Sequence, residues 1–325
     1  MNTIILFFLF LSSSSIHTVL SRSLFNFQKL DLPSTSVGPD SITFDSFGRG
    51  PYTGISDGRI VKYNTSYFVE VYITSPHRTS SKCDGTDNPA ILGPICGRPK
   101  GLDFYYKEKK LYIADAYKGF LVGEKKRLAV PLATGAEGVP FKFLSGLNVD
   151  QLTGDVYFAD ASSVFQLSQI TAAVLANDRT GRLLKYSHRT KQVSVLLRRL
   201  GGAVGVALSS DGSFVLVSEY IAKRIIKFWL RGPMAFKSQV ILNLQGNPTN
   251  IKRTQVGDSF WVAVNKMSLG LTVPIAININ ENGVVLRTIP LDRYYFNTTI
   301  SEFSQRGSNF YVGSLQADFV GVLKK

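Results

Sequence analysis

Residues 155–197 contain DVYFADAS (155–162), TGRLLKYS (180–187) and QVSVLL (192–197), three runs rich in β-branched, aromatic and other apolar residues. Such runs, bounded by Gly, Asp, Ser and Thr, are typical of β-strands that follow one another across turns. Pieces of the same stretch recur along the chain. Residues 155–197 therefore predict most of one repeating unit in a larger β-structure.

The repeat is clearest in the run that opens this stretch. It is found as PYTGIS, LYIADAY, DVYFADAS, SFVLVSEY, SFWVAVN and NFYVGSL, centred on Tyr52, Tyr112, Tyr157, Val215, Trp261 and Tyr311. A short strand and a turn precede each run, and further strands such as GRIVKYN and FVEVYIT follow it. Four strands per repeat at intervals of roughly 45 to 60 residues are typical of propeller blades. The sequence predicts an all-β fold, a six-bladed β-propeller.

One segment departs from the strand pattern. SSVFQLSQITAAVLANDR, at residues 162–179, contains good helix formers with helix-compatible spacing over 166–176. We predict a short helical insert between two strands of the third blade. Long inserts in compact folds are often binding loops or lids, and the other interpretation is a surface helix that packs on its own blade.

The amino-terminal residues predict a targeting segment. Residues 1–21 contain an apolar run over 4–11, then Ser-rich sequence and small residues that permit cleavage before Arg22. This pattern predicts a secretory signal peptide, although its first part carries no Lys or Arg. A membrane anchor would need roughly 18 to 20 apolar residues, far more than this run contains, and we expect no later segment to span a membrane. We expect residues 22–325 to form a single propeller domain.

The two cysteines fit the same compartment. Cys83 and Cys96 lie in a polar loop after the first blade, and in an oxidising compartment they most simply form a disulfide. A metal site is the weaker alternative, because no His or further Cys accompanies them. Asn64 and Asn297 begin N-glycosylation sequons. We expect a glycoprotein of the secretory pathway, in the vacuole or the extracellular space.

The formal charge of +14 raises the possibility of nucleic-acid binding, because Lys and Arg contacts to phosphate dominate such binding. The positive residues, however, occur in small groups at expected turns, such as 107–110 and 198–199. Neither a recognised nucleic-acid motif nor a long basic tract is present. We therefore expect no nucleic-acid partner.

Six segments together carry a family resemblance. They are LYIADAYKG (111–119), GVPFKFLSGLNVDQLTGDVYFADASS (138–163), NDRTGRLLKY (177–186), SSDGSFVLVSEY (209–220), IIKFWLRGP (225–233) and NPTNIKR (247–253). The chain resembles plant strictosidine synthase and the strictosidine-synthase-like proteins over nearly its whole length after residue 21. The resemblance implies a six-bladed propeller, often vacuolar, with a pocket at the central end of the blades. In the synthase this pocket serves alkaloid metabolism: it condenses tryptamine with the aldehyde secologanin in a Pictet-Spengler reaction, without a cofactor.

The resemblance also implies where catalysis would occur. The family's reaction uses one glutamate as acid and base, at the start of the last blade's first strand, and such work demands a positioned group of matched pKa. By this match Ser301 occupies the position, and serine cannot replace a carboxylate in that role. Glu302 is adjacent, but neighbouring strand residues point to opposite faces, so Glu302 would substitute only after a one-residue slip. The catalytic residue is therefore unknown, and strictosidine formation itself is not expected.

The first strands, aligned on one another, predict the lining of the pocket. The equivalent channel-facing position of the six strands is occupied by Asp40, Lys100, Ser145, Val204, Thr249 and Ser301, and Asn250, one step later, is counted with this set. By the family resemblance, Phe143 keeps an aromatic residue of the pocket. Lys100 and Ser145 stand where the family has aromatic residues, so we expect a pocket that is not shaped for tryptamine. A desolvated lysine can lose its proton and form a Schiff base with a carbonyl. The other interpretation of Lys100 is a channel-mouth lysine that reaches solvent or pairs with Asp40.

Three functions remain open: an enzyme acting on an amine, aldehyde or ester, a calcium-dependent ester or lactone hydrolase, and a non-catalytic ligand-binding propeller. Calcium takes about six to eight oxygen ligands including carboxylates, and Lys100 would repel a cation beside Asp40. We expect a small-molecule ligand or substrate, no metal, no cofactor and a monomer.

Other titratable residues give weaker signals. Asp115, Asp160 and Glu219 end second strands near one rim, where they either line the pocket or, more commonly, cap turns and pair with Lys or Arg. His77 and His188 are not placed beside Ser301, and a serine nucleophile needs a base within hydrogen-bond reach. We therefore expect no serine-hydrolase site.

Overall fold

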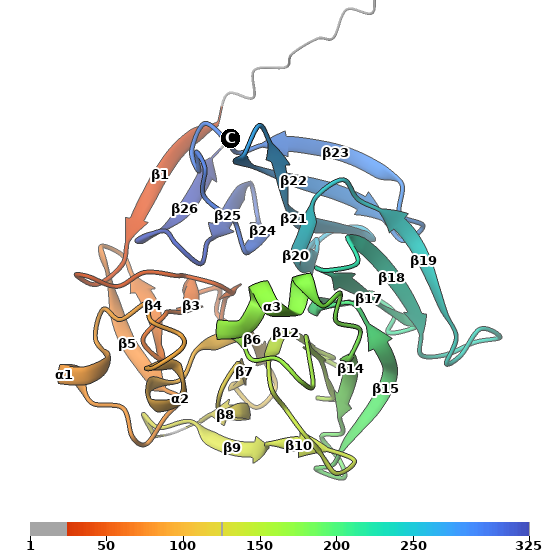
Figure 1. Ribbon diagram of the computed structural model, residues 1–325, viewed down its shortest axis with the longest axis horizontal. Coiled ribbons are helices and arrows are strands. Elements are labelled where there is room, and N and C mark those ends of the chain that lie inside the picture. Colours follow the sequence, from red (N-terminus) through yellow and green to blue (C-terminus); the bar gives the residue numbers. More distant parts are fainter. Residues whose placement is uncertain (1–24, 125, 325) are drawn as a thin grey trace, which may run out of the picture.

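Six four-stranded sheets surround a central axis in the computed structural model, which describes residues 25–124 and 126–324 (Figure 1). Every pair of neighbouring strands within a sheet is antiparallel. This arrangement confirms the predicted six-bladed β-propeller. The predicted signal peptide, residues 1–21, lies outside the described residues.

The first three blades run in chain order from the axis outward. The first contains β2 (Ile42–Thr43), β3 (Tyr52–Gly54), β4 (Arg59–Asn64) and β5 (Tyr67–Ile73). The second contains β6 (Pro99–Tyr105), β7 (Lys110–Asp115), β8 (Gly119–Gly123) and β9 (Val130–Ala133). The third contains β12 (Leu144–Val149), β13 (Val156–Asp160), β14 (Gly181–Tyr186) and β15 (Val193–Leu200), and a small hairpin of β10 (Gly135–Ala136) and β11 (Val139–Pro140) precedes it.

The next two blades follow the same order. The fourth contains β16 (Ala203–Leu208), β17 (Phe214–Glu219), β18 (Arg224–Trp229) and β19 (Ser238–Asn243). The fifth contains β20 (Asn247–Arg253), β21 (Ser259–Ser268), β22 (Leu271–Asn280) and β23 (Val285–Pro290). The repeated run from which the blades were predicted forms the second strand of every blade.

The sixth blade combines both ends of the described chain. It contains β24 (Glu302–Arg306), β25 (Asn309–Gly313) and β26 (Phe319–Lys324), and its outer strand is β1 (Asn26–Asp31). Pairing runs from Asn26 with Lys324 to Asp31 with Phe319. The chain therefore closes the ring by pairing its first described strand with its last, which the repeat pattern did not predict.

Neighbouring blades are held together by apolar and aromatic side chains. The rings of Phe120 and Phe158 stack across the second and third blades with centroids 4.7 Å apart. Trp261 and Phe303 meet across the fifth and sixth blades at 4.8 Å. Such pairs add to the stability gained from apolar burial, and they fix the inner strands that carry the site.

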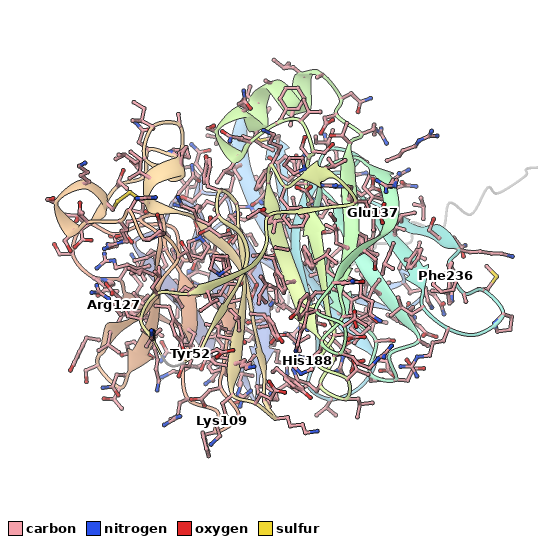
Figure 2. The ribbon with its side chains drawn as sticks, turned by 90° about the horizontal axis from the view of Figure 1, so that it is seen from below. Tyr52, Lys109, Arg127, Glu137, His188 and Phe236 are labelled. Carbon is pink, nitrogen blue, oxygen red and sulfur yellow. A yellow bond between two sulfur atoms is a disulfide. The ribbon has the colours of Figure 1, made fainter. Side chains whose placement is uncertain are left out.

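The helices gather on one face of the ring. The predicted insert forms η1 (Leu167–Gln169) and α3 (Ile170–Leu175), and Figure 1 shows α3 lying over the centre of the propeller. The disulfide loop contains α1 (Ser80–Cys83) and α2 (Gly93–Cys96). In the side view of Figure 2, α3 and the disulfide loop lie at one face, and Lys109 and His188 lie at the other. Within the described part of the chain, none of the helices has the length and apolar character needed to cross a membrane.

Candidate functional site

A cavity of about 130 Å³ lies at the central end of the blades, beneath η1 and α3. The structure brings all eight residues of the predicted pocket to its wall, together with four that were not predicted. The full lining is Asp40, Lys100, Phe143, Ser145, Leu167, Ile170, Val204, Tyr220, Thr249, Asn250, Ser301 and Leu315. One part of the wall is apolar and the other carries charges, hydroxyls and an amide.

Irregular pairing of the inner strands aims side chains into this cavity. The register between the first and second strands shifts at Pro99/Gly101, Leu144/Leu147, Ala203/Gly205 and Pro248/Ile251. These shifts flank the cavity-lining Lys100, Ser145, Val204 and Thr249. A bulge bends a strand locally and re-aims a side chain. Four blades thus present side chains to the cavity by the same device, and of these the fifth blade presents both Thr249 and Asn250.

The inner strands also approach one another closely just below the cavity. A β-carbon at Gly146 would lie 2.6 Å from the carbonyl oxygen of Val204, and one at Gly101 would collide with the carbonyl oxygen of Ser145. Only glycine permits such an approach. These glycines therefore allow the inner strands of neighbouring blades to pack close together below the cavity.

The charged end of the cavity contains a buried ion pair. The side chains of Lys100 and Asp40 are 7% and 1% exposed, and Lys100 Nζ contacts Asp40 Oδ2. Burial lowers the pKa of the Lys100 ammonium; the Asp40 carboxylate opposes this decrease, and the guanidinium of Arg98 adds to it. Of the two interpretations of Lys100, the ion pair with Asp40 is therefore present, and the amine remains inside the cavity.

Ser301 joins three blades. Its hydroxyl donates a hydrogen bond to the backbone carbonyl of Asp40 at 2.8 Å, and its own carbonyl accepts from the backbone N–H of Asn250 at 2.9 Å. The side chain lines the cavity but its proton is already directed at a carbonyl oxygen. No histidine lies among the twelve lining residues, so the cavity supplies no histidine base to Ser301.

Glu302 is turned to a different environment. Its side chain is fully buried and does not line the cavity. Oε1 accepts from the backbone N–H of Ile42 at 2.9 Å, Oε2 accepts from the Ser41 hydroxyl at 3.1 Å, and Lys252 Nζ lies 3.5 Å from Oε2. Burial raises the pKa of Glu302 to about 7, against the opposing effect of Lys252 and the hydrogen bonds. Pairing of Glu302 with Gly313 continues through β24 without a register shift.

The acidic residues predicted at the rim form ion pairs and hydrogen bonds within their own blades. Asp160 pairs with Arg182 and Glu219 pairs with Arg224. Asp115 accepts hydrogen bonds from the backbone N–H groups at the turn that follows β7, including that of Tyr117 at 2.8 Å. None of the three lines the cavity. His188 lies at the opposite face (Figure 2), with Nε2 2.9 Å from a carboxylate oxygen of Glu108.

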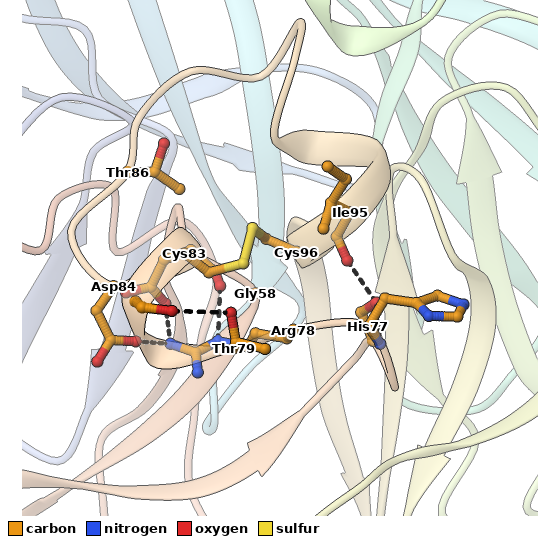
Figure 3. Close-up of a disulfide and its surroundings, with 12 residues drawn as sticks. Gly58, His77, Arg78, Thr79, Cys83, Asp84, Thr86, Ile95 and Cys96 are labelled. Atoms are coloured by element: carbon orange, nitrogen blue, oxygen red, sulfur yellow. Dashed lines mark hydrogen bonds and ion pairs between the residues drawn. A yellow bond between two sulfur atoms is a disulfide. The ribbon is translucent and has the colours of Figure 1, made fainter.

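The loop that leads to Lys100 is held by the predicted disulfide. Cys83 and Cys96 are bonded, with Cα atoms 5.7 Å apart, and both are buried. Figure 3 shows Arg78 directed at Asp84 beside the disulfide. Because β6 begins shortly after Cys96, this loop also anchors the start of the strand that carries Lys100.

The helical insert is fixed at both ends. The Ser162 and Thr180 hydroxyls lie 3.2 Å apart, and Ser162 Oγ accepts from the backbone N–H of Phe165 at 2.8 Å. Leu167 and Ile170 face the cavity and pack with Phe143 and Val204. The insert therefore forms a wall of the cavity.

Comparison with known proteins agrees with these features. The family model described as strictosidine synthase matches residues 145–233. STRICTOSIDINE SYNTHASE-LIKE 12 of Arabidopsis thaliana is 45% identical over 304 residues, which cover 92% of this chain and 90% of that protein. The chain belongs to the strictosidine synthase-like family. STRICTOSIDINE SYNTHASE-LIKE 11 of the same plant is 41% identical over 97% of this chain and 96% of its own length.

Strictosidine synthase of Catharanthus roseus is 37% identical to this strictosidine synthase-like chain over 305 residues, covering 91% of this chain and 86% of the synthase. Among solved structures, a gluconolactonase of Xanthomonas campestris has a TM-score of 0.63 at 14% identity, covering 92% of this chain and 89% of that one. The calcium-binding protein regucalcin of Agrobacterium tumefaciens has a TM-score of 0.62 at 12% identity, covering 92% and 93%. These two likenesses show the propeller fold alone.

Five residues of this strictosidine synthase-like site were missed from the sequence. Leu167 and Ile170 belong to the insert, which was predicted to be helical and either a binding loop or lid or a surface helix, without a prediction of which residues face the cavity. Tyr220 and Leu315 follow second strands and have no repeat signal of their own. Arg98 lies two residues before Lys100, and only the folded chain shows that it is buried there.

Proposed function

We propose that the protein binds a small metabolite with an apolar body and a polar end in the central cavity, and that it does not form strictosidine. The observation that carries this proposal is the cavity lining, which combines the apolar cluster of Phe143, Ile170 and Val204 with the Asp40–Lys100 pair. Concave, largely apolar sites with a few placed polar groups are typical of small-molecule binding. Its family relatives named for strictosidine synthesis support a ligand from plant specialised metabolism.

The absence of strictosidine formation rests on Ser301 and Glu302. Ser301 lines the cavity without an acidic group, and the carboxylate of Glu302 is engaged by Ser41 and Ile42. A general acid and base must reach the atoms between which it moves a proton. Neither residue supplies such a group inside the cavity.

Incubation with tryptamine and secologanin, followed by mass spectrometry, tests this part directly. We expect no strictosidine from this protein and strictosidine from the Catharanthus roseus synthase as the control. A gain of product in Ser301→Glu would support the assignment of Ser301 to the catalytic position. Strictosidine from the unchanged chain would overturn the proposal.

The second candidate is an enzyme that acts on an amine, aldehyde or ester, and the buried amine of Lys100 in the cavity favours it. Turnover would then depend on Lys100 and Ser301, and equal rates for the wild type and the double Ala variant would contradict it. A calcium-dependent hydrolase receives less support, because Asp40 is the one carboxylate in the lining and it pairs with Lys100. Among the described residues, no group of three His, Cys, Asp or Glu side chains is placed to hold a metal ion.

We also propose that the protein follows the secretory route to the vacuole or the extracellular space. The disulfide supports an oxidising compartment, and Asn64 and Asn297 of the two sequons are exposed. Glycosidase digestion should reduce the mass of the protein expressed in plant tissue. The decrease should be smaller in the Asn64→Gln and Asn297→Gln variants, because each lacks one glycosylation site. A plant-expressed protein with no mass change would contradict glycosylation.

A further inference from the structure

Lys100 places an amine in a setting that surface lysines lack. Its side chain is 7% exposed, Nζ contacts the carboxylate of Asp40, and both residues line the cavity. Arg98, also buried, adds a second positive charge nearby. Asp40 thus pairs with Lys100, and Arg98 acts on this pair through its charge.

Other carboxylates near Arg98 are engaged elsewhere. Asp57 pairs with Arg59 and Arg78, and Asp115 accepts hydrogen bonds from the backbone N–H groups of Arg98 and Tyr117. Burial lowers the pKa of Lys100, the Asp40 carboxylate opposes this decrease, and the charge of Arg98 adds to it. A neutral amine, unlike an ammonium, has the lone pair that attacks a carbonyl carbon.

We propose that Lys100 forms an imine with the aldehyde or ketone group of the ligand that occupies this cavity, with Asp40 as the proton carrier. The inference rests on the proposed binding function and names its substrate class. The apolar wall of Phe143, Ile170 and Val204 faces the rest of the molecule and excludes water from the new bond.

The step balances without a further reactant. The Nζ lone pair forms a bond to the carbonyl carbon, the carbonyl π electrons move to oxygen, and a proton passes from nitrogen through Asp40 to that oxygen. The resulting carbinolamine then loses water: the nitrogen lone pair forms the double bond as the hydroxyl leaves, and Asp40 carries the remaining nitrogen-bound proton to that hydroxyl. Amine and carbonyl give imine and water, and nothing is oxidised or reduced.

Reductive trapping tests the inference on the full chain. The protein is incubated with phenylacetaldehyde and sodium cyanoborohydride, which reduces an imine to a stable secondary amine, and peptides are mapped by mass spectrometry. We expect Lys100 to be labelled several-fold faster than the exposed Lys107 and Lys191, because burial and the charge of Arg98 lower the pKa of Lys100 and so raise the fraction of neutral amine. This measurement uses the wild type, so it does not depend on whether a variant folds.

Two variants separate the roles of the pair. Lys100→Arg keeps a cation beside Asp40 and removes the amine, so the fast label should disappear, whereas Lys191→Arg should leave it unchanged. Asp40→Asn retains the amine and removes the proton carrier, but it also removes the carboxylate that raises the pKa of Lys100. The two proteins are therefore compared at pH values where labelling no longer rises with pH, and there labelling of Lys100 in the variant should be slower by about tenfold or more. Labelling of Lys100 at the rate of exposed lysines would overturn the inference.

A thermal-shift titration with phenylacetaldehyde, run without the reductant, distinguishes the two proposals. A ligand-dependent increase in melting temperature without an adduct on Lys100 would sustain the binding function and refute the imine. If the titration gives no thermal shift and the trapping experiment gives no adduct on Lys100, both the imine and the binding of this class of carbonyl compound are refuted. A shift together with a rapid Lys100 adduct supports both.

Discussion

Glu302 is an acid buried among three blades, and its chemistry makes the stability of the protein depend on pH. In the unfolded chain its carboxyl has an ordinary pKa, whereas burial raises the pKa to about 7 in the folded protein. The native state therefore binds the extra proton between those values. This contribution to stability is fully present below the unfolded pKa and is lost as the pH rises through about 7.

Glu302→Gln should remove this dependence. Glutamine can accept from Ile42 N–H and donate to the Ser41 hydroxyl, and Lys252 can turn toward the solvent. At pH 8 we expect the variant to have a higher melting temperature than the wild type. At pH 5 the difference in melting temperature should be smaller or absent. Thermal unfolding at both pH values measures the difference, and a variant that is equally affected at pH 5 and pH 8 would contradict the assignment.

The Asp40–Lys100 pair leads to a second prediction at this scale. Lys100→Ala leaves the Asp40 carboxylate buried without its cation, which costs about 3 to 5 kcal/mol of unfolding free energy. Lys100→Met combined with Asp40→Asn removes both charges and should lose much less. Urea unfolding of the two variants gives the comparison; equal losses would show that the pair contributes through packing alone.

At the scale of elements, the disulfide loop is the part of the fold most directly tied to the site. Its two cysteines are separated by 13 positions, and closing a loop of that size stabilises a protein by about 3 kcal/mol. Reduction, or Cys83→Ser with Cys96→Ser, should lower the unfolding free energy by that amount. The double variant should not respond to a reductant, and a wild type that does not respond either would contradict this prediction.

The insert containing α3 should affect ligand binding more than stability. Leu167→Ala with Ile170→Ala removes apolar surface from the cavity wall, and we expect about tenfold weaker binding of phenylacetaldehyde. Leu175→Ala, in the same helix, changes a side chain that is 83% exposed and should leave binding unchanged. Equal effects of the two changes would remove α3 from the site.

Elements differ in how far the sequence predicts them. Strand alternation and turn residues are local signals, so the second strands and the six equivalent inner positions followed from the repeat. The insert was recognised by its helical spacing, but its place over the cavity depends on packing against Phe143 and Val204. The partners of Glu302 come from two other blades, and no local pattern predicts them.

At the scale of the whole molecule, β1 completes the sixth blade. Deletion of residues 1–31 removes this strand and exposes the edge of β26, whereas deletion of residues 1–21 leaves β1 in place. We expect the longer deletion to lower the melting temperature by about 10 °C or more, and the shorter one to have little effect. Thermal unfolding of both chains measures this, and similar melting temperatures would show that ring closure contributes little.

Because β1 pairs with β26, the ring can close only after both strands have been synthesised. Residues 26–31 emerge from the ribosome long before their partner, residues 319–324. Until residues 319–324 have been made, the first strand has no sheet to join and the growing blades keep an open edge, a state prone to association with other chains. Completion of this ring therefore waits for the synthesis of five other blades, and chaperones have their main opportunity to protect the chain during that interval.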